Sequence, residues 1–258
     1  MTLTELFGAT DISTVVLFCV KTTSDRKLIT ELAAMRLEKN ASGKMVSKKS
    51  MNLLINQPAY VIPENEGIKQ VTEEEASNLF GDILVSTDEK PVLMCAFNAQ
   101  LELSVVSKLL RGKKLNVQFL DALTICRDRY PGPYSVLDAL NHYNAAEEIR
   151  TGEIEKELAL NSVLGLGVLI GCMAQERNDV LSYINLIGME KDRTTPGKPR
   201  RGIVYCEQTP VTDEMAPIEK SLPQLISNAP ADRLVALPNG AYLVSIDDTK
   251  RNNTKARG

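Results

Sequence analysis

Apolar runs separated by polar turns are the main pattern of the first 176 residues. Residues 14–21 form a continuous β-branched and aromatic run, which predicts a buried strand. Residues 28–38 and 45–56 predict two more strands, and the KNASGK segment between them has turn chemistry. The chain is therefore expected to open with a three-stranded meander.

Helical spacing appears after this meander. Thr72 precedes three glutamates and is predicted to cap a helix whose apolar positions recur every three or four residues. Further elements are expected as strands at 91–97 and 115–120 and as helices at 100–111, 134–143 and 153–175. This order predicts an α/β protein with a mixed five-stranded sheet flanked by helices.

The sequence changes in character after residue 176. Residues 179–189 can continue helically, and the segment DRTTPGKPRR at 192–201 has the composition of a linker. A strand is expected at 202–206, and strands at 234–237 and 241–246 flank Asn239-Gly240, a strong hairpin signal. We therefore predict three parts: domain 1–176, a helix and linker at 177–201, and a small C-terminal α+β hairpin module at 202–258 with a disordered tail.

Composition excludes several kinds of protein. The 258 residues carry a net charge of −3 and one histidine, His142, which excludes any site that needs several imidazoles. The five cysteines are scattered and odd in number, which favours reduced thiols and a cytoplasmic location. The longest apolar stretches are shorter than the roughly 20 residues of a membrane-spanning helix, so no membrane association is expected.

Several segments, in order, resemble the DnaQ-like (DEDDh) 3′–5′ exonucleases of the ribonuclease H-like fold. The first are VVLFCVKTT at 15–23, where that family has an Asp-x-Glu-Thr-Thr strand end, and LITELAAMRL at 28–37. VLMCAFNAQLEL at 92–103 resembles the His-Asn-Ala-x-Phe-Asp pattern, and FLDALTICRDRYPG at 119–132 the Asp-Thr-Leu step. YSVLDALNHYN and ELALNSVLGLGVL resemble the last two helices. The resemblance implies the ribonuclease H-like fold for nearly all of the first domain.

The resemblance also implies four carboxylates that hold two divalent ions and a histidine that acts as general base. In this sequence those positions hold Cys19, Lys21, Glu102, Glu157 and Ser162. A thiol is a poor ligand for Mg²⁺, and the ammonium of Lys21 repels cations. Lys21 is expected to pair with Glu102 or Glu157. We therefore interpret the site as degenerate, with no bound metal and no functional catalytic residue.

Other candidate residues have simpler explanations. His142 lies near the end of a predicted helix, where it can act as a cap, and Asp121 is expected to be a structural turn residue. Nucleic acid could contact two short basic runs, through Lys113 and Lys114 and through Lys198, Arg200 and Arg201. Neither run has the interleaved aromatic residues of a base-stacking surface.

The favoured hypothesis is a catalytically inactive, exonuclease-like protein that binds a protein partner or nucleic acid in a nucleic-acid-processing or mobile-element system. Two alternatives stay open. One is a divergent exonuclease that acts on single-stranded DNA or RNA with Mg²⁺ or Mn²⁺ at Glu102 and Glu157. The other is a non-catalytic binder of single-stranded nucleic acid. The exonuclease family contains dimers, so a homodimer also stays open.

Overall fold

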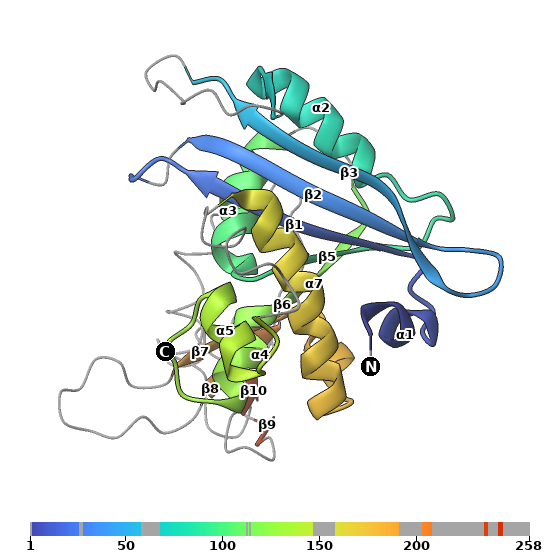
Figure 1. Cartoon of the computed structure of the whole chain (residues 1–258), viewed down its shortest axis with the longest axis vertical. Coiled ribbons are helices and arrows are strands. Elements are labelled where there is room, and N and C mark those ends of the chain that lie inside the picture. The colour runs from blue at the N-terminus through green and yellow to red at the C-terminus, as the bar shows by residue number, and fades with distance from the viewer. Residues whose placement is uncertain are drawn as a thin grey trace, which may run out of the picture.

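The computed structural model describes residues 2–25, 28–57, 68–111, 113, 115–146, 158–190, 203–207, 235–236 and 242–244. Its main sheet has six strands in the order β4-β3-β2-β1-β5-β6 (Figure 1). The strands are β1 (Thr14–Thr22), β2 (Ile29–Lys39), β3 (Met45–Ile55), β4 (Lys69–Val71), β5 (Val92–Ala96) and β6 (Val117–Asp121). The predicted mixed α/β sheet is thus present, with the short edge strand β4 in addition to the five strands expected.

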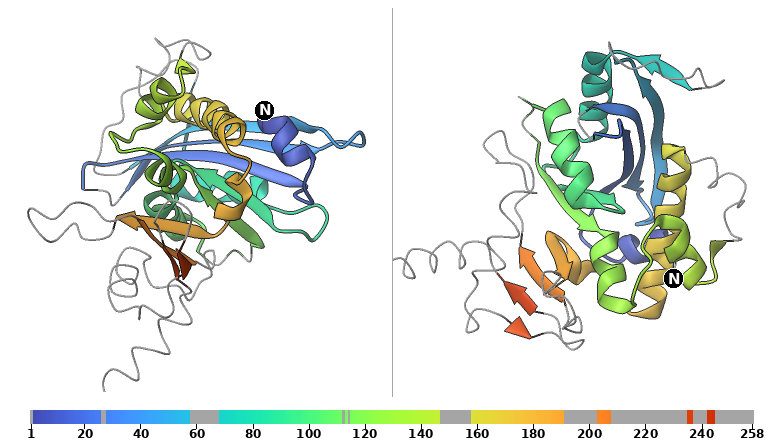
Figure 2. Two further views of the ribbon diagram at one scale, coloured as in Figure 1. Left: turned by 90° about the horizontal axis from the view of Figure 1, so that it is seen from below. Right: turned by 90° about the vertical axis from the view of Figure 1, so that its left-hand side faces the viewer.

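The first three strands form the predicted antiparallel meander, whereas β5, β6 and β4 pair in parallel with their neighbours. The helices are α1 (Leu3–Gly8), α2 (Glu73–Ile83), α3 (Ala99–Leu109), α4 (Ala122–Arg129), α5 (Val136–His142), α7 (Ala159–Glu176) and the 3₁₀ helix η2 (Val180–Tyr183). Helices α2 and α3 cover one face of the sheet and α7 covers the other (Figure 2). This arrangement is the mixed sheet with flanking helices that the sequence predicted.

Burial on both faces explains the continuous apolar run in β1. Leu17 belongs to the apolar cluster on the α7 face, whereas Phe18 belongs to the cluster on the α2 and α3 face. The rings of Phe18 and Phe80 lie 5.8 Å apart. A strand between two helical layers has no solvent-facing side, so its sequence does not alternate between apolar and polar residues.

Helix α2 is fixed at both ends. The Thr72 hydroxyl accepts a hydrogen bond from the Glu75 N–H at 3.1 Å, and the Glu75 carboxylate accepts one from the Thr72 N–H at 2.9 Å. This capping box satisfies two helix donors, as the sequence predicted for Thr72. At the other end the buried guanidinium of Arg36 on β2 donates to the carbonyls of Ile83 and Val85. Arg36 thereby attaches the end of α2 to the sheet.

Helix α7 is by length and composition apolar enough to cross a membrane, with a mean hydropathy of 1.3 over 18 residues. In the structure 56% of that stretch is buried, and the helix packs against β1, β2, α1 and α5. Its residues Val163, Leu166 and Leu169 are at most 1% exposed. The hydrophobicity of α7 is therefore explained by its place at the centre of the core.

The chain after α7 differs from the expected helix at 179–189. It forms η2 and then the strand β7 (Leu186–Glu190). Asn185 has a positive φ of 61°, and its backbone N–H and side-chain oxygen bond to the carbonyl and N–H of Phe119 in β6. Gly188 N–H also donates to the Thr124 hydroxyl at 2.8 Å. These tertiary hydrogen bonds outweigh the local helical pattern.

The described part of the C-terminal region contains only strands. β7 pairs antiparallel with β8 (Ile203–Glu207), and β8 pairs parallel with β10 (Tyr242–Val244). β10 pairs antiparallel with β9 (Val235–Ala236). The predicted Asn239-Gly240 turn, the linker at 192–201 and the predicted disordered tail lie outside the described residues. The proposed division into domains stays a prediction.

Candidate functional site

Three elements meet at the carboxyl end of β1. This end of β1 carries Cys19 and Lys21, the first turn of α3 carries Glu102, and the first turn of α7 carries Ser162. Hydrogen bonds and electrostatic interactions place these four residues, together with Glu31 on β2, in one polar cluster. We call these five residues the β1-end cluster. The structure thus brings together four of the five positions named from the sequence, although their separations reach 143 residues between Cys19 and Ser162.

Glu102 is the most buried member of the β1-end cluster, with 6% of its surface exposed. Its two carboxylate oxygens accept hydrogen bonds from the backbone N–H groups of Val20 at 3.1 Å and Asn98 at 3.4 Å. The pairing of β1 with β5 covers only Val15 to Leu17, so the Val20 N–H lies beyond the end of that ladder. The Glu102 carboxylate thus supplies the Val20 N–H with the acceptor that a carbonyl of a paired strand would otherwise provide.

Burial raises the pKa of Glu102 to about 8, and the nearby Asp121 carboxylate adds to this rise. The two backbone N–H groups and Lys21 oppose the shift without cancelling it. A carboxyl with this pKa is mostly protonated at neutral pH. Glu102 therefore offers little negative charge to a cation under those conditions.

Cys19 and Ser162 connect β1 to α7. The Cys19 side chain is half-buried, and a hydrogen bond with the Ser162 side chain favours its thiolate. Burial has a larger effect and, together with the Glu102 charge, raises the pKa of Cys19 far above its usual value. Cys19 is therefore a neutral thiol, which makes it a weak nucleophile and a poor ligand for a hard cation.

Glu31 is a member of the cluster that sequence reasoning missed. It lies directly opposite Lys21 in the antiparallel β1–β2 register and is 7% exposed. Burial raises the pKa of Glu31, and Lys21 and the Ala159 N–H oppose the shift. One sequence feature could have identified Glu31. It is an acidic residue on the same face of the predicted strand as the apolar residues Ala33 and Met35. Lys21 thus lies opposite Glu31 across the strand pair, and its charge also acts on Glu102.

Glu31 also caps helix α7. Its carboxylate accepts a hydrogen bond of 2.9 Å from the N–H of Ala159, the first residue of the helix. The N-cap residue Leu158 has no side-chain oxygen that could serve this purpose. A carboxylate at a helix N-terminus satisfies a free donor and interacts favourably with the helix dipole. Glu31 therefore links the polar cluster to the position of α7.

Replacing Glu31 by alanine is expected to lower the free energy of unfolding by about 1–2 kcal/mol, because it leaves the Ala159 N–H without an acceptor. Urea denaturation followed by circular dichroism measures the change. Glu31→Gln serves as the control because its amide oxygen can still accept this bond. An equal loss in both variants would show that charge, and not the hydrogen bond, holds α7.

The residues present do not fit a pair of divalent ions. Such a centre needs several anionic oxygens, whereas this cluster combines an ammonium, a neutral thiol, a hydroxyl and two carboxyls engaged by backbone N–H groups. Within the described residues, no group of three or more His, Cys, Asp and Glu side chains is arranged to hold a metal. Glu157, the fifth predicted position, lies outside the described residues.

His142 and Asp121 both take part in local packing. His142 is exposed in the last turn of α5, and its ring stacks on Tyr130 with centroids 3.9 Å apart. Asp121 is 1% exposed and accepts hydrogen bonds from the Ala99 N–H at 2.9 Å and the Thr124 hydroxyl at 2.5 Å. Asp121 therefore has a structural role between β6, α3 and α4, as expected.

Only one of the basic residues proposed to contact nucleic acid can be placed. The Lys113 ammonium donates to the Asn78 side chain at 3.1 Å, and its stem lies across Gly81 on α2. A Cβ added to Gly81 would come within 2.8 Å of that stem, so Lys113 is packed against the helix. Lys114, Lys198, Arg200 and Arg201 lie outside the described residues.

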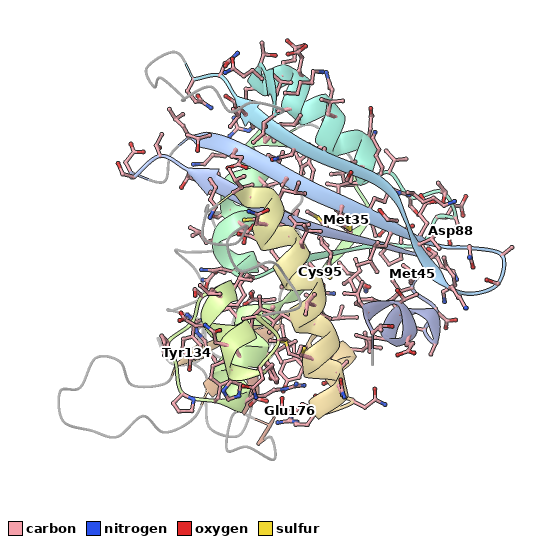
Figure 3. The ribbon with its side chains drawn as sticks, in the orientation of Figure 1. Met35, Met45, Asp88, Cys95, Tyr134 and Glu176 are labelled. Atoms are coloured by element: carbon pink, nitrogen blue, oxygen red, sulfur yellow. The ribbon has the colours of Figure 1, made fainter. Side chains whose placement is uncertain are left out.

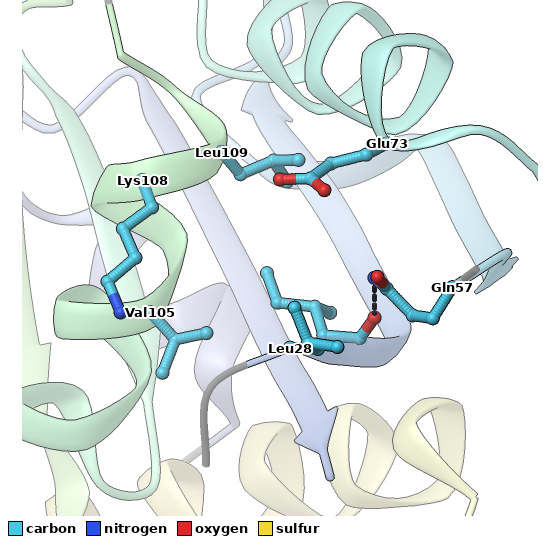
Figure 4. Close-up of a pocket in the computed structure, with 7 residues that line it drawn as sticks. Leu28, Gln57, Glu73, Val105, Lys108 and Leu109 are labelled. Carbon is cyan, nitrogen blue, oxygen red and sulfur yellow. Dashed lines mark hydrogen bonds between the residues drawn. The ribbon is translucent and has the colours of Figure 1, made fainter. Parts of the chain in front are cut away.

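A small pocket lies between β2, α2 and α3 (Figure 4). It is lined by Leu28, Ile29, Gln57, Glu73, Val105, Lys108 and Leu109. Its volume of about 30 Å³ is enough for roughly one or two water molecules and too small for a nucleotide or an organic cofactor. The Gln57 amide donates to the Ile29 carbonyl at 2.7 Å, which holds the ends of β3 and β2 together.

The fold and the cluster define a mixed α/β protein with a lysine-containing polar cluster at the carboxyl end of its central strand. No protein-family model matches the sequence, and no curated protein matches it. Among solved structures, exonuclease X in complex with 5′ overhanging duplex DNA is similar at 12% identity and a TM-score of 0.38. That match covers 64% of this chain and 93% of the exonuclease chain.

Proposed function

We propose that this chain is a non-catalytic protein with an exonuclease-like fold that acts by binding a protein partner. The observation that carries the proposal is the β1-end cluster, where Lys21 occupies a position at which the resembling family has a carboxylate. Its positive charge lies near Glu31 and Glu102 and opposes the rise in pKa that burial causes in both. The charge that a metal would supply is thus provided by the protein.

Hydrogen bonds within the fold support the same conclusion. Glu102 is bound to the backbone of β1 and α3, and Glu31 to the start of α7. Metal coordination would compete with these bonds for the same oxygens, and each buried N–H left unpaired would cost about 1–3 kcal/mol. The cluster is therefore better suited to holding β1, β2, α3 and α7 together than to hydrolysis.

The purified chain is expected to release no nucleotides from single-stranded DNA or RNA in Mg²⁺ or Mn²⁺, and to show no heat of Mn²⁺ binding up to millimolar concentrations. The combined variant Lys21→Asp and Ser162→Asp is expected to gain Mn²⁺ affinity in the same calorimetric titration, because it restores two anionic ligands beside Glu102. Lys90→Asp with Ser47→Asp, which makes the same changes elsewhere on the surface, serves as the control. Metal-dependent degradation that Glu102→Ala abolishes would contradict the proposal.

A further inference from the structure

The outer side of β3 is a long unpaired sheet edge. β3 pairs with β2 along its length apart from a register shift at Lys48, but on its other side β4 covers only Leu53, Leu54 and Ile55. No other described strand pairs there. The four residues from Ser47 to Ser50 are all exposed, so this stretch is open at the edge and on both faces. In Figure 1, β3 runs along one border of the sheet.

The direction of the free hydrogen-bonding groups follows from the strand geometry. The Asn56 N–H donates to the Val71 carbonyl at 2.9 Å, so it points outward toward β4. Because N–H groups alternate from side to side along a strand, those of Asn52 and Ser50 also point outward. Met45 to Asn52, eight residues, span about 26 Å of free edge, which matches the length of an ordinary strand.

A group of basic side chains accompanies this edge. Lys44, Lys48 and Lys49 are exposed, and within the described residues none lies within ion-pair distance of a carboxylate. Residues 1–176 are acidic on balance, with 18 basic and 23 acidic side chains. A group of three lysines along one strand edge therefore differs in charge from the rest of this part of the chain. We call the edge from Met45 to Asn52, with these three lysines, the β3 edge.

Lysines on a free edge discourage aggregation because they repel other positively charged strands. Their charge therefore restricts which partners can pair with the edge. In a second copy of the chain paired antiparallel at β3, Lys48 and Lys49 would meet each other across the interface and repel. A nucleic acid would meet the positive charge but has no regular series of donors and acceptors to pair with the strand backbone. An extended acidic segment satisfies both the lysines and the backbone.

We propose that the β3 edge binds an acidic, extended segment of a partner protein by strand addition. The peptide backbone pairs with the outward groups of β3, and its carboxylates lie beside Lys44, Lys48 and Lys49. This inference deepens the proposed binding role and rests on it for the expectation of a protein partner. The surface is formed by β3 and its turn and does not involve the β1-end cluster.

The test uses the full chain and a fluorescent ten-residue peptide in which Glu alternates with Val and Thr. Fluorescence anisotropy at low salt is expected to show binding that weakens as salt increases, because the charges are exposed. The same peptide with Lys in place of Glu is expected not to bind. Amide hydrogen exchange at Ser50 and Asn52 is expected to slow when the acidic peptide is added.

Two variants separate the contributions of charge and backbone. Lys48→Glu with Lys49→Glu is expected to weaken binding at least about tenfold, because it reverses the charge at the edge. Ser50→Pro is expected to weaken it by a similar factor, because it removes one outward N–H and obstructs a neighbouring strand. The charge variant leaves the backbone intact, so it tests the proposal even if Ser50→Pro fails to fold. Lys90→Glu with Lys108→Glu is the charge-matched control and is expected to retain binding.

Three results would overturn the inference. The first is the absence of peptide binding at low salt. The second is binding that the charge variant weakens and a folded Ser50→Pro variant does not, which indicates simple attraction of polyanions, including oligonucleotides. The third is a concentration-dependent dimer that Ser50→Pro abolishes, which assigns the edge to a second copy. None of these results measures metal-dependent nuclease activity. They can therefore contradict peptide binding at the β3 edge without contradicting the proposal that the chain is non-catalytic.

Discussion

Replacing Arg129 by methionine is expected to lower the free energy of unfolding by about 1.5–3 kcal/mol, because it removes a charged donor from a partly buried ionic network. The Arg129 side chain is only 1% exposed. Its guanidinium donates to the carboxylates of Glu176 at 3.0 Å and Asp179 at 2.6 Å, and to the Met173 carbonyl at 2.5 Å. Glu176 is labelled near the end of α7 in Figure 3. One side chain of α4 thus holds the end of α7 and the chain that follows it.

The loss arises mainly from the groups left without partners. Methionine fills a similar volume, so the cavity contribution is small, but the carboxylates and the carbonyl lose a charged donor at a partly buried site. Chemical denaturation in urea measures the change, and Arg111→Met, at an exposed arginine, is the control with an expected change within about 0.5 kcal/mol. A loss below about 1 kcal/mol for Arg129→Met would show that the network contributes no more than a surface ion pair.

The second large effect concerns pH. The pKa of Glu102 is raised from 4.5 to about 8, so the folded protein retains a proton that the unfolded chain releases at lower pH. Below pH 4.5 both states are protonated and burial of Glu102 carries no ionisation penalty. As the pH rises from 4.5 to about 8, the unfolded state ionises first, and the free energy of unfolding falls by an amount on the order of 5 kcal/mol. Above about pH 8 the contribution is constant.

Neighbouring groups define how this pH effect should be tested. Asp121, whose pKa is raised to about 6, contributes in the same direction at lower pH, as does Glu31, whose pKa is also raised. Lys21 and Cys19 are the other titratable groups of the site. Glu102→Gln is expected to flatten the stability curve measured by urea denaturation between pH 5 and 8, because glutamine does not titrate. The exposed substitution Glu74→Gln should leave the curve unchanged. Parallel curves for the wild type and Glu102→Gln would contradict the expectation.

Local patterns predicted most of the main sheet and its helices. The apolar runs at β1 and β5 carry their own signal because each strand is buried on both faces, and Thr72 with Glu75 identifies the start of α2 by a capping pattern that needs no distant partner. Segments stabilised by distant contacts were less predictable. The strand β4 has only three residues, and β7 forms where a helix was expected because Asn185 bonds to β6.

In the candidate site, too, some properties follow from the sequence and others only from the tertiary structure. The sequence by itself determined which chemical groups stand at the end of β1, because Lys21 and Cys19 supply an ammonium and a thiol whatever the fold. Only the tertiary structure decided what the remaining carboxylates do. Glu102 and Glu31 bond to backbone N–H groups of Val20 and Ala159, which are 82 and 128 residues away in the sequence. Burial and these hydrogen bonds determine the protonation and the structural role of Glu102 and Glu31. Burial and hydrogen bonding both depend on atoms that are distant in the sequence and that only the fold brings together.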